Sequence, residues 1–174
     1  MRRVFIPLTV VLCFLIAPYA SAVLLQDAYN SALPGAGYDK LVYLDPAETY
    51  YGGLTISNAS VCILSHGATV LLAGSRIIVE SNATLDICGV VLTYSDSAAI
   101  KFNGAATGWI DHCSFFNNYD AVYFWTGANV KLTSNIFSYS NHYGVFTCQG
   151  TERFLAYNDA WQNAMGDYRE WCPG

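Results

Sequence analysis

The chain has 174 residues, of which 53% are hydrophobic and 12% are charged, and its formal net charge is −5. This apolar content excludes an intrinsically disordered chain, because enough surface can be buried to offset the conformational entropy lost on folding. The negative charge argues against a nucleic-acid-binding protein, which needs a basic surface for the phosphates. The length fits one domain, since domains usually contain about 100–200 residues.

Residues 1–22 have the layout of a secretory signal peptide. Arg2 and Arg3 form a positive start, Val4–Ile16 is an apolar stretch, and Ala20–Ala22 is a small-residue cleavage signal. The apolar stretch is short for a bilayer span, so an uncleaved membrane anchor is the less favoured alternative. Removing the peptide changes the net charge to −7 and leaves five cysteines, and no later apolar run reaches membrane length. We therefore expect a protein without a membrane span that is secreted, periplasmic or held at the cell surface.

Residues 23–53 are predicted to form an N-terminal cap and a first strand. A short helix near Gln26–Leu33 is expected to cover the open strand edge at the start of the following segment, because uncovered edges pair with other chains. Residues 54–174 then form the repeating part of the chain.

The repeating part contains a β-type unit with a period of about 22–26 residues, within the range typical of solenoids. Each unit alternates apolar and polar residues over a few positions, which is typical of β-strands. Recurrence of the same residue type at a fixed spacing predicts a solenoid, in which each coil stacks on the next and equivalent positions touch. The matching segments are Leu85–Val90, Ile110–Phe115, Leu132–Phe137 and Leu155–Ala160.

One column of equivalent positions is predicted to run along the stacked coils. Coils lie about 4.8 Å apart, a spacing at which asparagine side chains hydrogen-bond to one another along the stack. Cysteine at such a position is a small residue that is readily buried. We expect free thiols here, because parallel Cβ atoms on neighbouring coils lie farther apart than a disulfide allows. The predicted column consists of Cys62, Cys88, Cys113, Asn135 and Asn158.

The remaining cysteines of the mature chain, Cys148 and Cys172, are separated in the sequence by about one coil. They are candidates for a disulfide at the less regular end of the solenoid, because disulfides persist in exported proteins. Because five is an odd number, at least one cysteine is unpaired or pairs outside the chain. The sequence contains neither Cys-x-x-Cys nor His-x-x-His, so no metal site is expected.

The start of the mature chain resembles the opening of secreted right-handed parallel β-helix proteins of the pectin/pectate-lyase-like superfamily. The resemblance lies in Leu25–Tyr29, Leu41–Pro46 and Thr49–Ile56, and it extends over nearly all of the mature chain. It implies an all-β fold, a right-handed parallel β-helix of about five coils between Leu54 and Cys172. It implies little about activity, because this superfamily includes lyases, hydrolases, epimerases and non-catalytic surface proteins.

A second resemblance points to candidate catalytic residues. Trp109–His112 is similar to the Trp-Ile-Asp-His segment of pectate lyases, and Asp120 falls where that family has Asp-Gly-Leu. It implies catalytic roles for Asp111 and His112 in a lyase, whose cofactor would be calcium. Asp86 joins them because a glycoside hydrolase needs two carboxylates about 5–9.5 Å apart. The acid expected shortly after Asp120 and the motif Arg-x-Pro-x-x-Arg are both absent, so the alternative is that these side chains are ordinary solvated residues.

Aromatic residues predicted to face outward are candidates for carbohydrate binding. They are Tyr119, Tyr123, Trp125 and Tyr143. Aromatic faces rimmed by polar groups often mark binding surfaces, but scattered surface aromatics also occur simply as padding over turns and neighbouring coils. Both interpretations remain open for these four residues.

Because no catalytic set is complete, we favour a non-catalytic extracellular module that binds a polysaccharide or a cell-surface glycan without a cofactor. The alternative is a polysaccharide lyase or glycoside hydrolase relative that acts on acidic glycans. The C-terminal coil has no evident cap, although solenoid ends need a covering element. Either the protein continues beyond Gly174, or another molecule stacks end to end on this coil.

Overall fold

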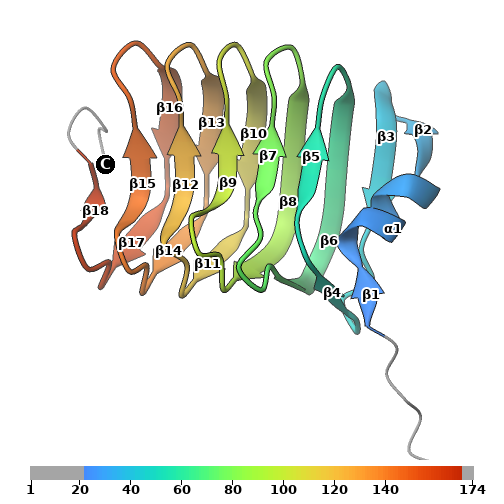
Figure 1. Ribbon diagram of the computed structural model, residues 1–174, viewed down its shortest axis with the longest axis horizontal. Coiled ribbons are helices and arrows are strands. Elements are labelled where there is room, and N and C mark those ends of the chain that lie inside the picture. The colour runs from blue at the N-terminus through green and yellow to red at the C-terminus, as the bar shows by residue number, and fades with distance from the viewer. Residues whose placement is uncertain (1–21, 170–174) are drawn as a thin grey trace, which may run out of the picture.

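The computed structural model describes residues 22–169, which form a parallel β-solenoid of about six turns with one short helix (Figure 1). The parallel all-β fold predicted from the repeats is confirmed. The predicted capping helix is also present, as α1 (Leu25–Ser31), which follows β1 (Val23–Leu24) at the N-terminal end. The predicted signal peptide lies outside the described residues except for Ala22.

Each turn carries three strand segments, and equivalent segments of successive turns pair in parallel. An antiparallel hairpin of β2 (Leu33–Gly35) and β3 (Tyr38–Tyr43) precedes the regular coils. β3 also pairs in parallel with β6 of the next turn, so it belongs to the first coil as well as to the hairpin. The further strands of the first three turns are β4 (Thr49–Tyr51), β5 (Leu54–Ile56), β6 (Ser60–Leu71), β7 (Ile77–Val79), β8 (Thr84–Thr93) and β9 (Ala98–Phe102). Those of the last three turns are β10 (Thr107–Asp111), β11 (Ser114–Phe116), β12 (Asp120–Phe124), β13 (Asn129–Thr133), β14 (Ile136–Ser138), β15 (Tyr143–Thr147), β16 (Glu152–Ala156), β17 (Asp159–Trp161) and β18 (Gly166–Tyr168).

The strands form two sheets. The first sheet contains the order β1-β4-β6-β8-β10-β13-β16, with β11, β14 and β17 paired beyond a bend and β3 paired to β6. The second sheet has the order β5-β7-β9-β12-β15-β18 and lies nearer the viewer in Figure 1. We call the outer side of β3, β6, β8, β10, β13 and β16 the β10 face, and the outer side of the second sheet the β12 face.

The core is a column of apolar side chains supplied in turn by each coil. Ile63, Ile87, Ile110 and Leu132 are register partners on successive strands of the first sheet, and all are buried. Phe102 and Phe124 of the second sheet meet edge to face, with ring centroids 5.8 Å apart. Fully burying one such side chain stabilises a fold by roughly 1.5–3 kcal/mol, so the stacked columns hold the coils together.

The predicted polar column is confirmed for its last three members. The backbone amide of Cys113 donates to Asn135 Oδ1 over 2.9 Å, and Asn135 Nδ2 donates to Asn158 Oδ1 over 2.9 Å. Cys113 is buried, and this burial raises the pKa of its thiol to about 12. A comparable arrangement on another corner has Asn118 and Asn163 accepting from the backbone amides of the preceding turns.

The prediction is wrong for Cys62 and Cys88, which do not share a column with Cys113. Cys62 is the register partner of Asp86, whereas Cys88 lies between Leu64 and Asp111. The cause is a displacement of two residues in the repeat alignment: the coils pair Cys62 with Asp86 and Cys88 with Asp111, two positions before the cysteines that the repeat aligns. The three thiols are free, as expected, but they do not stack on one another.

No helix within residues 22–169 combines the length and the apolar character that crossing a membrane requires.

Candidate functional site

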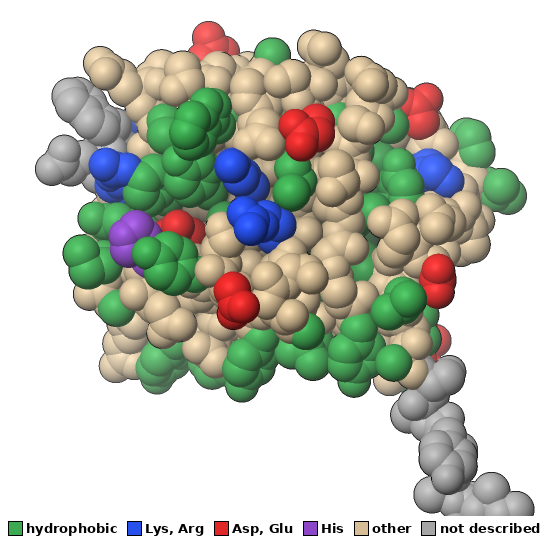
Figure 2. Space-filling view, in the orientation of Figure 1, with side chains coloured by type: hydrophobic (Ala, Val, Ile, Leu, Met, Phe, Trp, Pro, Cys, Tyr) green, Lys and Arg blue, Asp and Glu red, His purple; other side chains and the backbone are tan. Residues whose placement is uncertain are grey.

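The four aromatic residues predicted to bind carbohydrate lie together on the β12 face. Tyr119 precedes β12, Tyr123 lies within it, Trp125 follows it, and Tyr143 begins β15. We call these residues, together with His142 and Phe146, the aromatic surface. Figure 2 shows hydrophobic side chains gathered around a histidine and an acidic residue at the end of this face nearest β15.

Parallel pairing explains why these rings meet. Lys101, Tyr123 and Phe146 are register partners on β9, β12 and β15, so their side chains stand in one column. The Tyr123 and Phe146 rings stack with centroids 4.5 Å apart and an interplanar angle of 11°. Trp125 stacks on Tyr123 from the same strand, with centroids 5.9 Å apart. Alternation along β12 turns Val122 and Phe124 inward and leaves Tyr123 on the outer side.

The rings differ in how much of their surface reaches solvent. Trp125 is 49% exposed and Tyr119 is 42% exposed, whereas Tyr123 and Tyr143 are half-buried and Phe146 is buried. Tyr119 stacks on His142 with centroids 4.8 Å apart, and Tyr143 contacts Phe146 edge to face. The two exposed rings therefore stand on a floor formed by the other members of the aromatic surface.

Two cations lie against the aromatic surface. Lys101 Nζ is 5.6 Å from the centroid of Tyr123 and 5.3 Å from that of Trp125. The guanidinium of Arg169 lies 4.0 Å from the centroid of Phe146. Such cation–π contacts hold both side chains over the rings, and they place positive charge on a chain whose net charge is negative.

His142 of the aromatic surface pairs with the buried carboxylate of Asp120. His142 Nδ1 lies 2.9 Å from Asp120 Oδ1, which also accepts the Tyr143 backbone amide over 2.9 Å. Burial raises the pKa of Asp120, although these hydrogen bonds and Arg169 oppose the rise. Four further residues of this region are not among those predicted from the sequence: His142, Phe146, Lys101 and Arg169. The spacing of one coil between Asp120 and His142 is the signal that could have pointed to this pair.

The three predicted catalytic residues lie on the other face. Asp86 of β8 and Asp111 of β10 line one groove of about 260 Å³, together with Tyr38, Cys62, Cys88 and Trp109. Asp86 is the register partner of Trp109, and Asp111 that of Cys88, so the two carboxylates stand diagonally on neighbouring strands. Tyr38 Oη donates to Asp86 over 2.5 Å, and this hydrogen bond is the main reason why the pKa of Tyr38 rises to about 12.

Asp111 is held by side chains from its own turn and the next. Thr133 Oγ1 donates to Asp111 Oδ1 over 2.5 Å and accepts the Trp109 indole N–H over 2.6 Å. His112 Nδ1 lies 2.8 Å from Asp111 Oδ2. Burial disfavours the charged form of Asp111, but the hydrogen bonds from Thr133 and His112 outweigh it and lower the pKa of the carboxyl group.

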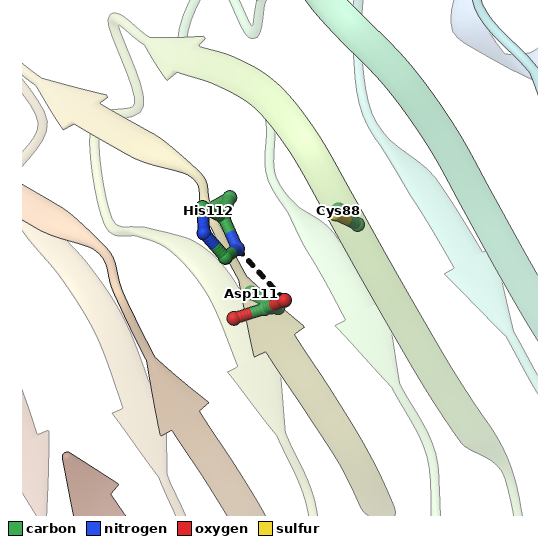
Figure 3. A group of neighbouring side chains, drawn as sticks. All are labelled: Cys88, Asp111 and His112. Atoms are coloured by element: carbon green, nitrogen blue, oxygen red, sulfur yellow. Dashed lines mark ion pairs between the residues drawn. The ribbon is translucent and has the colours of Figure 1, made fainter. Parts of the chain in front are cut away.

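Cys88 completes a group with Asp111 and His112 (Figure 3). One potential ligand atom from each of the three side chains lies within 4.8 Å of the other two. Burial and the nearby charge of Asp111 raise the pKa of the half-buried Cys88 thiol. This donor set does not fit the calcium ion expected for a lyase, because calcium takes six to eight oxygen ligands whereas two of these donors are sulfur and nitrogen.

The predicted disulfide partner Cys172 lies outside the described residues, so the bridge to Cys148 stays a prediction. Cys148 Sγ lies 3.5 Å from the Tyr123 hydroxyl, beside the aromatic surface.

Comparison with known proteins identifies the fold family. A family model described as "Right handed beta helix region" matches residues 42–167. Neither the search of curated proteins nor the search of solved structures gives a match. The matched segment runs from β3 into β18 and so spans the stacked coils and both faces described above. The chain belongs to the right-handed β-helix family.

Proposed function

We propose that this protein is a secreted, non-catalytic β-helix module that binds a polysaccharide or a cell-surface glycan on its aromatic surface. The observation that carries this proposal is the exposure of Trp125 and Tyr119 on a floor of stacked rings. Sugar rings present C–H groups that pack against aromatic faces, and a rigid floor reduces the entropy lost when the exposed rings are immobilised by a ligand.

The extended shape of the surface favours a chain of several sugars over a single one. Tyr119 and Trp125 lie at opposite ends of β12, and six residues of strand span about 20 Å. A glycan that touches both rings would lie along the strand and pass over Tyr123. Such a ligand would also pass near Lys101, which lies close to both Tyr123 and Trp125.

The two cations support an acidic glycan as the ligand. Lys101 and Arg169 stand over rings of the aromatic surface, where a carboxylate or sulfate on the sugar could pair with them. The carboxylate of Asp120, which lies next to this surface, is buried and engaged by His142. A negatively charged glycan on the aromatic surface would therefore lie beside the positive charges of Lys101 and Arg169.

The test is binding of the purified protein to an array of neutral and acidic polysaccharides, followed by titration of the best ligand. Trp125→Ala is expected to weaken binding about tenfold or more, because truncating an aromatic anchor typically costs over about 2 kcal/mol. The matched control is Trp109→Ala, which removes a tryptophan of similar exposure from the β10 face. Equal losses in both variants, or no glycan bound by the wild type, would contradict the proposal.

A second candidate is favoured by one observation, the presence of Asp86 and Asp111 in a common groove beside Trp109. In this candidate the protein is a polysaccharide lyase or glycoside hydrolase relative that uses Asp111 and His112. Release of unsaturated or reducing ends, lost in Asp111→Ala and retained in Asp86→Ala, would support a lyase; loss in both variants would support a hydrolase. Absence of depolymerisation on every acidic glycan tested, with and without calcium, would rule out this candidate.

A further inference from the structure

Cys88, Asp111 and His112 bring a thiol, a carboxylate and an imidazole to one point of the β10 face. Cys88 and Asp111 are register partners on β8 and β10, and His112 is the residue after Asp111. Figure 3 shows the three side chains on these two neighbouring strands, with Asp111 and His112 paired. His112 has a left-handed φ of +49° at the end of β10, where the chain turns into the next corner.

We propose that these three side chains bind a divalent transition-metal ion of the zinc class. The group contains one sulfur, one nitrogen and one oxygen donor within 4.8 Å of one another. A mixed set of this kind suits borderline-soft ions such as Zn²⁺ and Co²⁺, which accept thiolate, imidazole and carboxylate together. It suits neither magnesium nor calcium, which prefer oxygen ligands alone.

The carboxylate is already oriented as a metal ligand would be. Trp109 donates to Thr133, and Thr133 donates to Asp111 Oδ1, so this chain of hydrogen bonds fixes one carboxylate oxygen. The other oxygen, Oδ2, faces His112. Outer hydrogen bonds that orient a ligand in this way typically change metal affinity by about 10- to 100-fold.

Binding replaces a proton with the ion. Asp111 Oδ2 and His112 Nδ1 share a hydrogen bond, and Cys88 is a thiol whose pKa is raised. The ion forms bonds to the Cys88 thiolate, the Asp111 carboxylate and a neutral His112 nitrogen, and the thiol proton passes to solvent. The charge of the thiolate and the carboxylate then balances the charge of a divalent ion.

The site leaves a coordination position open. The His112 side chain is 67% exposed, and a second groove of about 400 Å³ reaches Cys88 and His112 from the side of Tyr43 and His66. With three protein ligands, the fourth position of a tetrahedral ion would face this groove and hold water or a small ligand. The site lies on the β10 face, so it is independent of the glycan surface on the β12 face.

The test uses the chelator-treated, reduced full chain titrated with Co²⁺ and with Zn²⁺. We expect one Co²⁺ per chain with a thiolate-to-cobalt charge-transfer band in the ultraviolet, displaced by Zn²⁺. Cys88→Ser should abolish this band, and Asp111→Asn and His112→Asn should each weaken Zn²⁺ binding at least tenfold. Asparagine is used at His112 because it tolerates a left-handed backbone. Thr133→Val should weaken Zn²⁺ binding by about 10- to 100-fold.

Two matched controls come from the same grooves. Cys62 lines the groove with Cys88, and His66 lines the second groove with His112, but neither belongs to the group. Cys62→Ser and His66→Ala should therefore keep the band and the affinity. No charge-transfer band in the wild type, a band that persists in Cys88→Ser, or equal losses in the control variants would overturn the assignment. Circular dichroism of each variant checks that the solenoid is folded.

Discussion

Asn135 joins three successive turns through its side chain. Its Oδ1 accepts the backbone amide of Cys113, and its Nδ2 donates both to the backbone carbonyl of Ile110 and to Asn158 Oδ1. The residue is 1% exposed, so water cannot replace any of these partners. One amide group therefore connects the corner between β13 and β14 to the corners of the preceding and the following turn.

Asn135→Ala is expected to destabilise the protein by at least about 2 kcal/mol. The substitution leaves the buried Cys113 amide without its acceptor, which costs roughly 1–3 kcal/mol, and it also removes the hydrogen bonds from Nδ2 to the Ile110 carbonyl and to Asn158 Oδ1. Urea denaturation measures the change in the free energy of unfolding. The control is Asn141→Ala, which removes an exposed asparagine of the same coil and should change stability by less than about 0.5 kcal/mol. A loss of similar size in both variants would mean that the ladder contributes nothing specific.

Phe124→Ala is expected to cost about 3–5 kcal/mol, because Phe124 is fully buried and packs edge to face on Phe102. Its removal opens a cavity inside a column that the coils above and below hold in place. Phe116→Ala is the matched control, since Phe116 is 45% exposed on the outer side of β11. Thermal and urea unfolding should separate the two variants clearly, and equal stabilities would contradict the assigned inward and outward directions.

The alternating pattern predicted which residues face inward, but it could not determine the register between coils. A shift of one residue moves a side chain to the opposite face of a strand, whereas a shift of two residues keeps it on the same face. The sequence repeat aligns Cys88 with Cys113, yet the register partner of Cys88 is Asp111, two positions earlier. A displacement of two residues leaves the alternation of apolar and polar positions unchanged, so the apolar pattern did not reveal the error.

The register between coils also determined how much of each site could be predicted from the sequence. The aromatic residues Tyr119, Tyr123 and Trp125 could be grouped because they lie close together in one coil. The group of Cys88 with Asp111 and His112 spans two coils and exists only in the observed register. No local spacing of metal ligands in the sequence corresponds to it, which explains why neither Cys-x-x-Cys nor His-x-x-His marks the site.

Gly108→Ala is expected to destabilise the protein by about 1–3 kcal/mol or more through overpacking. A Cβ at this position would lie 2.2 Å from the Leu85 carbonyl oxygen and 2.8 Å from Phe102 Cε1. The Leu85 carbonyl belongs to the strand paired with Gly108, so it cannot move without disturbing the sheet. The free energy of unfolding in urea tests this. An unchanged value would mean that the coils are spaced more loosely here than the contacts indicate.

The stability of the protein is expected to depend on the ionisation of Asp120. Burial raises the pKa of its carboxyl group in the folded protein above the ordinary value of 3.8, so the folded state binds the proton more tightly than the unfolded state. The penalty for burying the charge is therefore absent below the ordinary pKa and appears as the pH rises through the raised one. Asp120→Asn removes this penalty and keeps an oxygen that can accept from His142 and from the Tyr143 amide.

We expect Asp120→Asn to be as stable as the wild type or more stable at neutral pH, and to lose this advantage as the pH falls towards the ordinary pKa of aspartate. Urea denaturation of both proteins over this pH range gives the difference directly. His142 and Arg169 face the same carboxylate, so the series is repeated in the His142→Gln background, in which the sign of the pH dependence should persist. A difference that grows as the pH falls would show instead that the hydrogen bonds to the charged carboxylate outweigh its burial.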